Sequence, residues 1–458
     1  MAISPQLQPV PDQAAPFGVA RHLLVATVRA FWVIWIIYLG VACYGWYRSE
    51  YIKLQPRTVT DAYRSAADNY WASKPLYIMV NPATGEAFEH GFLYPPHSAV
   101  AWTPFTLLSK STGGATWAKV TEEIIWRTLG AALLFCSVRA LWRRAVLRDP
   151  LAPLPIWCGF TDDQLRHAPH LLAMGAIAMF CAGGSTMTGQ VNSLIGAAFV
   201  FAGLALSQQR WWSTALWLAL GLAFKPQMLP LIGVAAVLEW RASWRIALCC
   251  AGALALAWLN PDWSYDWSQH LAWREKMGVT TRAPGINSDI AGLVQPIAAW
   301  FGLSPSAGAY TPWRVIAAPL TLAACWLVWR RWVRPTTDVH RRAIGAVIVI
   351  VLCTGYVMLF NPRTEGNTYA VFGPPAGVML AIALRDRAWG FAAALGVACL
   401  GLMFSRELAG VFAGDLRGVT NYWMRPLATI VVLACLALMQ PRWWRARATS
   451  PGAAVAPV

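Results

Sequence analysis

Apolar stretches alternate with shorter polar segments along the whole chain. Twelve of these stretches are candidates for membrane-spanning helices, and they lie near residues 24–46, 118–142, 167–184, 190–207, 211–224, 227–240, 244–259, 312–332, 342–360, 370–384, 389–404 and 424–440. A spanning helix needs about 20 mostly apolar residues, and shorter ones are tolerated where protein surrounds them. The pattern therefore predicts an all-α polytopic membrane protein with about 12 transmembrane helices.

The composition supports this prediction, because 57% of the 458 residues are hydrophobic and only 13% are charged. A soluble domain carries about twice that charged fraction, whereas charge is costly where a surface faces lipid. Neither a repeat of fixed period nor a soluble domain is evident in the sequence. We expect one helical membrane domain over residues 1–448 and a disordered tail over residues 449–458.

The positive charge of the chain, formally +16, gathers in short arginine clusters beside the apolar stretches. Such clusters mark the cytoplasmic ends of membrane helices. Both termini are therefore expected in the cytoplasm, with residues 47–117 and 260–311 as external loops. No contiguous basic face or nucleic-acid motif occurs, so no nucleic-acid partner is predicted. The first apolar stretch lacks a following cleavage site and is expected to remain as a spanning helix.

Some apolar stretches do not fit a simple crossing. The stretch from His97 to Leu108 is short and broken by prolines, and it is predicted to lie on the outer leaflet, as is Ile290 to Phe301. The stretches 211–224 and 227–240 are each too short to cross alone. They are expected to form a hairpin that turns at Lys225-Pro226-Gln227 near the outer surface.

Two acids in the first external loop are candidates for catalysis. Asp61 and Asp68 lie seven residues apart in DAYRSAADNYW, and they share a face if this segment is helical. A carboxylate at a membrane surface can accept a proton from an attacking hydroxyl group, which is the work of a general base. Solvated acids in a loop, or a helix cap at Asp61, explain the same residues.

Polar side chains near other external helix ends are candidates for binding a sugar or an acceptor. Tyr94 and His97 lie in GFLYPPHSAVAW, where an aromatic belt at the interface is the alternative. Gln190 and Asn192 can donate hydrogen bonds to sugar hydroxyl groups or can satisfy neighbouring helices. His270 and Asn287 lie in a loop whose aromatic and acidic residues suit either a carbohydrate or an ordinary interface.

Cationic side chains at the same predicted surface are candidates for binding a phosphate. Lys225 lies between two apolar half-spans, where a lysine is costly unless it meets an anion or extends to lipid headgroups. Arg363 is suited to a bidentate phosphate contact, although a pair with Glu365 is equally compatible with FNPRTEGNTYAVF, which also contains Asn367. Arg282 of the large external loop is a further candidate.

Common cofactor and metal motifs do not occur in the sequence. Nine of the ten cysteines fall within apolar stretches, and neither a disulfide framework nor a CxxC metal pair is predicted. A P-loop, a Rossmann fingerprint, and GxSxG and HExxH motifs are all lacking. No cofactor and no metal ion is expected.

Taken together, the polar segments resemble glycosyltransferase family 87. The resemblance rests on five blocks in the family's order, namely DAYRSAADNYWASKPLY, FLYPPHSAVAWTPF, GQVNSLIGAAFVFAGLAL, LALGLAFKPQMLPL and NPRTEGNTYAVFGPP, over most of residues 58–385. It implies the GT-C architecture, with external juxtamembrane helices. It also implies inverting transfer of a sugar, mannose favoured, from a polyprenyl phosphate to a lipid or glycan acceptor.

The resemblance also implies where the reaction occurs and which residue is the base. The active site would face the periplasm from a bacterial inner membrane, among membrane lipids. The catalytic aspartate of the family lies at the start of the first external loop, which matches Asp61, with Asp68 as the second choice. Lys225, Arg363 or Arg282 would meet the charge of the leaving phosphate. A transporter or flippase of a lipid-linked saccharide is the rival prediction, and a non-catalytic assembly partner is a third.

Overall fold

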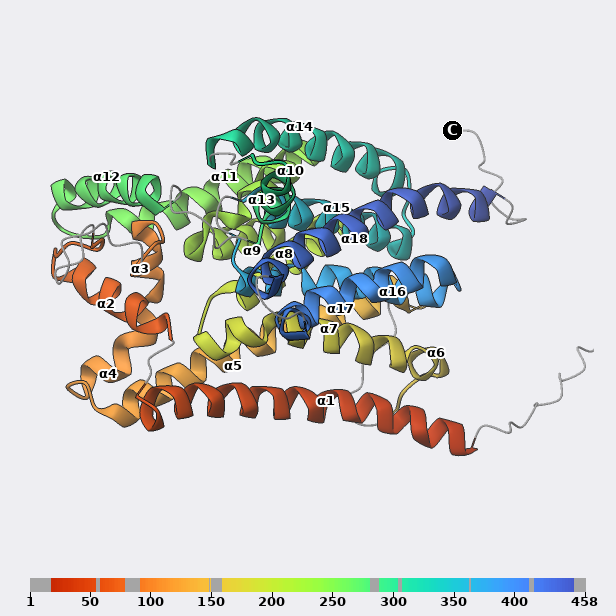
Figure 1. Cartoon of the computed structure of the whole chain (residues 1–458), viewed down its shortest axis with the longest axis horizontal. Helices are drawn as coiled ribbons and strands as arrows, with labels where there is room; N and C mark the ends of the chain where they lie inside the picture. The colour runs from red at the N-terminus through yellow and green to blue at the C-terminus, as the bar shows by residue number, and fades with distance from the viewer. Residues whose placement is uncertain are drawn as a thin grey trace, which may run out of the picture.

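Helices make up every regular element of the part of the chain that the structure describes. The computed structural model describes residues 18–54, 58–78, 91–147, 149, 159–280, 288–303, 307–361, 364–411 and 416–448. Within these ranges the elements run from α1 to α18 with short 3-10 and π turns between them, and no strand occurs (Figure 1). The prediction of an all-α protein is confirmed.

Six helices in the described ranges are long and apolar enough to cross a membrane. They are α1 (Gly18–Tyr47), α5 (Thr116–Leu141), α7 (Ala168–Thr188), α14 (Thr311–Val328), α15 (Val339–Phe360) and α18 (Leu416–Ala448), the last over Tyr422–Met439. The π turns η3 (Trp142–Val146) and η7 (Trp329–Val333) extend α5 and α14. Helices of this length and composition identify the chain as a membrane protein.

The other predicted spans coincide with shorter helices or, for α17, with a helix whose apolar part Trp389–Ser405 ends at a kink. They are α8 (Asn192–Ser207), α9 (Trp211–Phe224), α10 (Leu229–Leu238) after η4 (Pro226–Met228), α11 (Trp240–Ala255) with η5 (Leu256–Trp258), α16 (Gly373–Arg385) and α17 (Trp389–Val411), which is kinked at Phe404. A 16-residue helix such as α8 is about 24 Å long, less than the roughly 30 Å of a bilayer core. A seventh crossing arises if α11 and α12 (Trp263–Thr280), bent by 108°, form one broken span. The total of twelve crossings stays a prediction.

Short helices cover one end of the long helices, which we call the α2 end. It carries η1 (Arg48–Ile52), α2 (Thr60–Trp71), α3 (Pro96–Trp102), η2 (Thr103–Thr106), α4 (Leu107–Ser111) and α12 (Figure 1). The stretches predicted to lie on the outer leaflet are helical, the first as α3, η2 and α4. The second forms α13 (Ile290–Trp300), which η6 (Ala307–Tyr310) follows.

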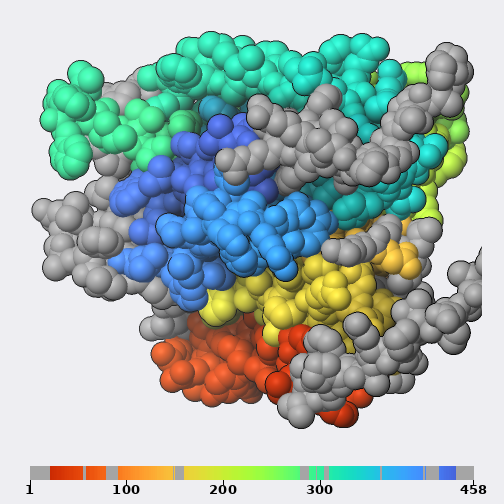
Figure 2. All heavy atoms as spheres, turned by 90° about the vertical axis from the view of Figure 1, so that its right-hand side faces the viewer, coloured from red at the N-terminus to blue at the C-terminus, as the bar shows by residue number. Residues whose placement is uncertain are grey.

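The opposite end of the molecule is rich in arginine, and we call it the arginine end. There Arg385 of α16 donates a 2.7 Å hydrogen bond to the main-chain oxygen of Ala145 in η3. Figure 2 views this end, with α1, α7, α16 and α14 following one another from bottom to top. α6 (Asp162–Arg166) also lies at this end (Figure 1). Predicted cytoplasmic arginines therefore lie at one end of the bundle, away from α2.

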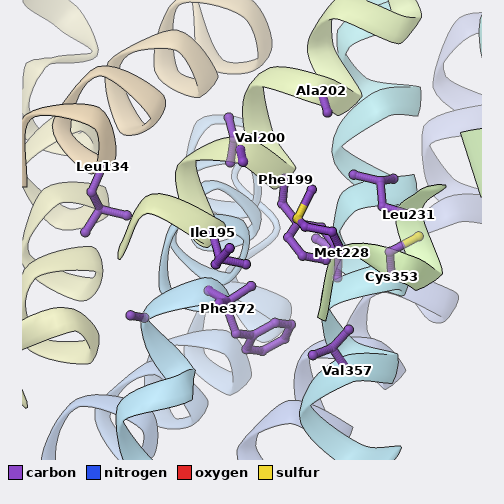
Figure 3. Packing of buried hydrophobic residues seen from close by; sticks show 14 of the residues in the cluster. Leu134, Ile195, Phe199, Val200, Ala202, Met228, Leu231, Cys353, Val357 and Phe372 are labelled. Atoms are coloured by element: carbon purple, nitrogen blue, oxygen red, sulfur yellow. The ribbon is translucent and has the colours of Figure 1, made fainter. Parts of the chain in front are cut away.

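Helix α8 forms the centre of the core, because nearly all of its residues are buried. Figure 3 shows Phe199 of α8 facing Met228 and Leu231, with Cys353 of α15 beside them. Gly196 lets η8 (Gly366–Val371) approach the helix closely, because an added Cβ would lie 2.9 Å from the main-chain oxygen of Ala370. This close approach brings η8 against the start of α8.

The chain reverses direction after α9, as the predicted hairpin requires. The rings of Trp212 and Trp244, at the starts of α9 and α11, lie 5.3 Å apart. Helix α10 must therefore return the chain to the level at which α9 begins. Helix α9 packs mainly on α11 and α8 rather than on α10. The turn at Lys225 is thus left at the α2 end, beside the start of α8.

Candidate active site

Lys225 is the cation that the fold holds at the end of α9. The helix ends here because Pro226 follows, and the residue before a proline favours an extended backbone, seen in the φ of −156° and ψ of 132° at Lys225. Its Nζ donates a 2.8 Å hydrogen bond to Oδ1 of Asn192 and lies 5.5 Å from the ring centre of Tyr94. Every salt bridge in the described part of the chain joins other residues. The contacts of Lys225 therefore orient its charge without neutralising it.

A chain of amide side chains links Lys225 to a carboxylate. Asn192 is fully buried, and its Nδ2 donates to Oε1 of Gln190 at 2.6 Å and to the main-chain oxygen of Asn367 at 3.1 Å. Gln190 in turn donates from Nε2 to Oε2 of Glu365 at 3.3 Å. Glu365 is exposed. These residues form one polar cluster, which we call the Lys225 cluster. It joins the end of α9 to the start of α8 and to Glu365, the residue before η8.

Aromatic rings form the wall between the Lys225 cluster and α2. The ring of Tyr63 on α2 lies 5.2 Å from Tyr94 and 4.7 Å from Trp102. Burial raises the pKa of the Tyr63 hydroxyl group, and the charge of nearby Glu365 acts in the same direction. Helix α2 therefore contributes its buried face to the site through Tyr63, while Asp61 and Asp68 lie on its exposed face.

Asp61 lies in the first turn of α2 with its side chain 61% exposed. It accepts a 3.0 Å hydrogen bond from Nη1 of Arg64, three residues later. The preceding residue, Thr60, packs on the turn that leads to Gln190, because a Cβ at Gly189 would lie 2.6 Å from its Cγ2. Asp61 thus follows the residue that contacts the edge of the Lys225 cluster at Gly189, and its described ion pair is with Arg64.

Asp68 lies on the same exposed face of α2, as the seven-residue spacing predicted. The ammonium group of Lys110 in α4 lies 2.7 Å from its carboxylate. The buried face of the helix carries Tyr63, Ala67 and Tyr70 instead. Asp68 is therefore paired near α4, about two helical turns from Asp61.

A buried ion network fixes the position of Arg64. Its Nη2 lies 3.3 Å from carboxylate oxygens of both Glu122 and Glu123 on α5. Glu123 also pairs with Arg127, which is fully buried and lies 4.4 Å from the ring centre of Trp46. The network ties the exposed carboxylate of Asp61 to the interior of the protein.

The two candidate histidines lie beside the site and differ in their surroundings. Nε2 of His97 lies 3.1 Å from the main-chain oxygen of Leu222, near the end of α9, so this nitrogen is the donor. Burial lowers the pKa of His97 to about 4. The ring therefore stays neutral and helps to hold the end of α9 that carries Lys225. His270 of α12 packs 5.2 Å from the Trp258 ring, and burial lowers its pKa too.

Three candidates from the sequence lie outside the described residues, namely Arg282, Asn287 and Arg363. The structure brings together six others, which are Lys225, Tyr94, Gln190, Asn192, Glu365 and Asn367. In the described ranges no group of three or more His, Cys, Asp or Glu side chains is arranged to hold a metal ion.

Sequence reasoning missed the ion network and one arginine. Glu122, Glu123 and Arg127 lie within an apolar helix, where charge is costly and indicates a function or a partner. The spacing of four residues between Glu123 and Arg127 was a second available signal. Arg425 of α18 lies close to Gly366 and 5.6 Å from the Tyr369 ring centre. No local pattern in the sequence points to that approach.

The comparisons with known proteins give one family. The family model of glycosyltransferase family 87 matches residues 92–362, which is more than half of the chain. The match includes Tyr94, Gln190, Asn192 and Lys225, begins after α2 and ends before Glu365. No curated protein matches the sequence.

Proposed function

This chain belongs to glycosyltransferase family 87, and on that premise we propose that it transfers a sugar from a polyprenyl phosphate to a lipid or glycan acceptor. Mannose is the favoured sugar, and the transfer inverts the configuration at the anomeric carbon. The observation that carries the proposal is the hydrogen-bonded chain from Lys225 through Asn192 and Gln190 to Glu365. It offers a cation, amides and a carboxylate side by side.

Lys225 is the proposed partner of the donor phosphate. Its neighbours are an amide oxygen and an aromatic ring, and neither cancels a full positive charge. A preoriented cation stabilises the negative charge that develops on a leaving phosphate without further reorganisation. Arg363 and Arg282 remain proposed as additional phosphate contacts.

The amide and aromatic groups beside Lys225 suit a sugar. Gln190 and Glu365 offer a donor and an acceptor for hydroxyl groups, and Tyr94 offers a ring face. His270, Asn287 and Asn367 complete the proposed sugar and acceptor contacts. Asn192 and His97 act by position, since Asn192 orients Lys225 and His97 holds the end of α9.

Asp61 is the proposed general base, with Asp68 as the second choice. The carboxylate takes the proton of the acceptor hydroxyl group while that oxygen attacks the anomeric carbon from the face opposite the phosphate. The bond between the anomeric carbon and the phosphate oxygen breaks, and its electron pair leaves with the phosphate toward Lys225. The place of Asp61 at the rim, directly after Thr60, which contacts Gly189, supports this role.

A GT-C architecture with the site on the periplasmic face of a bacterial inner membrane is part of the proposal. The Lys225 cluster and the arginine clusters lie at opposite ends of the molecule, and arginine-rich ends are cytoplasmic in membrane proteins. The rival function, transport of a lipid-linked saccharide, favours polar sites near the bilayer midplane between repeats. Here the polar chain joins the first residue of α8 to the residue that ends α9, which favours an enzyme.

The test is transfer of labelled mannose by the purified protein. Synthetic polyprenyl-phosphate mannose and GDP-mannose are offered in parallel with a membrane lipid extract, and mannose is then replaced by arabinofuranose. We expect transfer from the polyprenyl-phosphate donor and none from GDP-mannose. Movement of the intact donor across a vesicle membrane, with no transfer from any donor, would favour the transporter.

A further inference from the structure

A cavity whose chemistry differs from that of the Lys225 cluster lies at the arginine end. It has a volume of about 390 Å³ and opens between the end of α5 with η3, the end of α8 and the start of α9. Volumes of roughly 300–1,000 Å³ are typical of sites for small molecules. The cavity shares no lining residue with the Lys225 cluster.

Four arginines line this cavity, and none of its twelve described lining residues is acidic. Arg139, Arg143 and Arg144 are half-buried, and Arg210 is exposed. The like charges of Arg143 and Arg210 act unfavourably on Arg144, and an anion that enters the cavity offsets this repulsion. Guanidinium groups are also the side chains best shaped to bind phosphate oxygens.

Contacts behind the cavity fix the arginine-bearing segment. The Arg139 guanidinium lies 5.1 Å from the ring centre of Trp32. The main-chain oxygen of Arg144 lies 3.2 Å from Nδ1 of His340, and that of Ala145 accepts a hydrogen bond from Arg385. Because α15 and α16 hold η3 in this way, the backbone that carries Arg143 and Arg144 is fixed without a ligand.

The other wall of the cavity is apolar. The rings of Phe201 and Trp217 are stacked with their centres 4.7 Å apart, and Ala140 and Leu204 extend this wall. A soluble phosphate would leave such a surface unused. A phospholipid has both the anionic group for the arginines and the apolar chains for this wall.

We propose that this cavity binds the phosphate group of an anionic glycerophospholipid, with an acyl chain against Phe201 and Trp217. Basic pockets between membrane helices are suited to anionic headgroups. The site is independent of the proposed sugar transfer. It adjoins the far ends of the same two helices, since α8 runs about 24 Å from Asn192 to Ser207.

The test is lipid binding measured by native mass spectrometry on delipidated protein in a neutral detergent. Dioleoylphosphatidylglycerol, dioleoylphosphatidylcholine and inorganic phosphate are titrated against wild type and against Arg144→Gln/Arg210→Gln. We expect phosphatidylglycerol to bind tightest, and the double variant to bind it at least about tenfold more weakly, since each arginine contributes about 1 kcal/mol near a headgroup.

The matched control is Arg241→Gln/Arg330→Gln, which removes the same charge from exposed arginines outside the cavity. It should bind phosphatidylglycerol as the wild type does. Equal weakening in both double variants would overturn the site, and so would displacement of the lipid by inorganic phosphate. Thermal unfolding without lipid checks that each variant folds, and Arg210→Gln alone replaces the double variant if it does not.

Discussion

The ammonium group of Lys225 donates a 2.8 Å hydrogen bond to the side-chain oxygen of Asn192, 33 residues earlier in the chain. Asn192 is fully buried at the start of α8 and fixes this bond by donating two others from its Nδ2. The lysine is therefore oriented by a rigid neutral partner. This relationship links the central helix of the core to the charge that we assign to the donor phosphate.

The two acids of α2 should respond differently to the same substitution. Asp61→Asn removes the proposed base, and we expect the rate of transfer to fall by about 10²–10⁴. Asp68→Asn disrupts only an exposed pair with Lys110, so transfer should stay within about twofold of wild type. Initial rates with polyprenyl-phosphate mannose measure both. Equal losses in the two variants would contradict the assignment to Asp61.

Glu365 provides a second comparison, because it is the carboxylate that the amide chain reaches. Glu365→Gln keeps an oxygen that accepts the hydrogen bond from Gln190 but removes the charge. We expect a loss of about tenfold or less in kcat/KM, as for one weakened sugar contact. A loss as large as that of Asp61→Asn would move the role of base to Glu365.

Much of the fold follows from local sequence patterns. All twelve apolar stretches overlap helices, and the helix through DAYRSAADNYW puts Asp61 and Asp68 on one face, as their spacing predicts. The number of membrane crossings does not follow from local patterns in the same way. Helix α8 is apolar but only 16 residues long, and its burial comes from neighbours far away in sequence.

The site was only partly predictable for the same reason. Lys225, Gln190 and Glu365 were each identifiable as polar residues near apolar stretches. The bond between Gln190 and Glu365 joins residues 175 positions apart, and no spacing within one segment encodes it. The partner of Asp61 was closer, since Arg64 follows three residues later on the same helix.

The buried ion pair between Arg127 and Glu123 should dominate the stability of the α2 end. Arg127→Met leaves Glu123 with less compensation in the interior, and we expect unfolding free energy to fall by about 3–5 kcal/mol. Glu123→Gln/Arg127→Met removes both charges and should recover most of the loss. Denaturant unfolding of the three proteins in one detergent measures this. No recovery in the double variant would contradict the account.

His97 should make stability depend on pH below neutrality. Burial lowers its pKa from 6.5 to about 4, so between these values the unfolded state binds a proton that the folded state does not. Stability should therefore rise with pH from about 4 to 6.5, by up to about 3 kcal/mol. Outside that window the contribution of His97 to stability should not change with pH.

His97→Gln provides the control, because an amide can still donate to the oxygen of Leu222 but does not titrate. Thermal unfolding midpoints of wild type and variant are compared across this pH window. The variant should lose the part of the slope that belongs to His97. An unchanged slope would mean that other groups cause it.

Lys225→Met tests the central claim most directly, because methionine matches the lysine side chain up to Cε and lacks its ammonium group. Single-turnover transfer from polyprenyl-phosphate mannose is measured beside Lys53→Met, which removes an exposed lysine outside the Lys225 cluster. We predict that Lys225→Met slows transfer by about 10²–10³, the effect of losing one charge-stabilising group, while Lys53→Met does not. Transfer at the wild-type rate by a folded Lys225→Met protein would contradict the account.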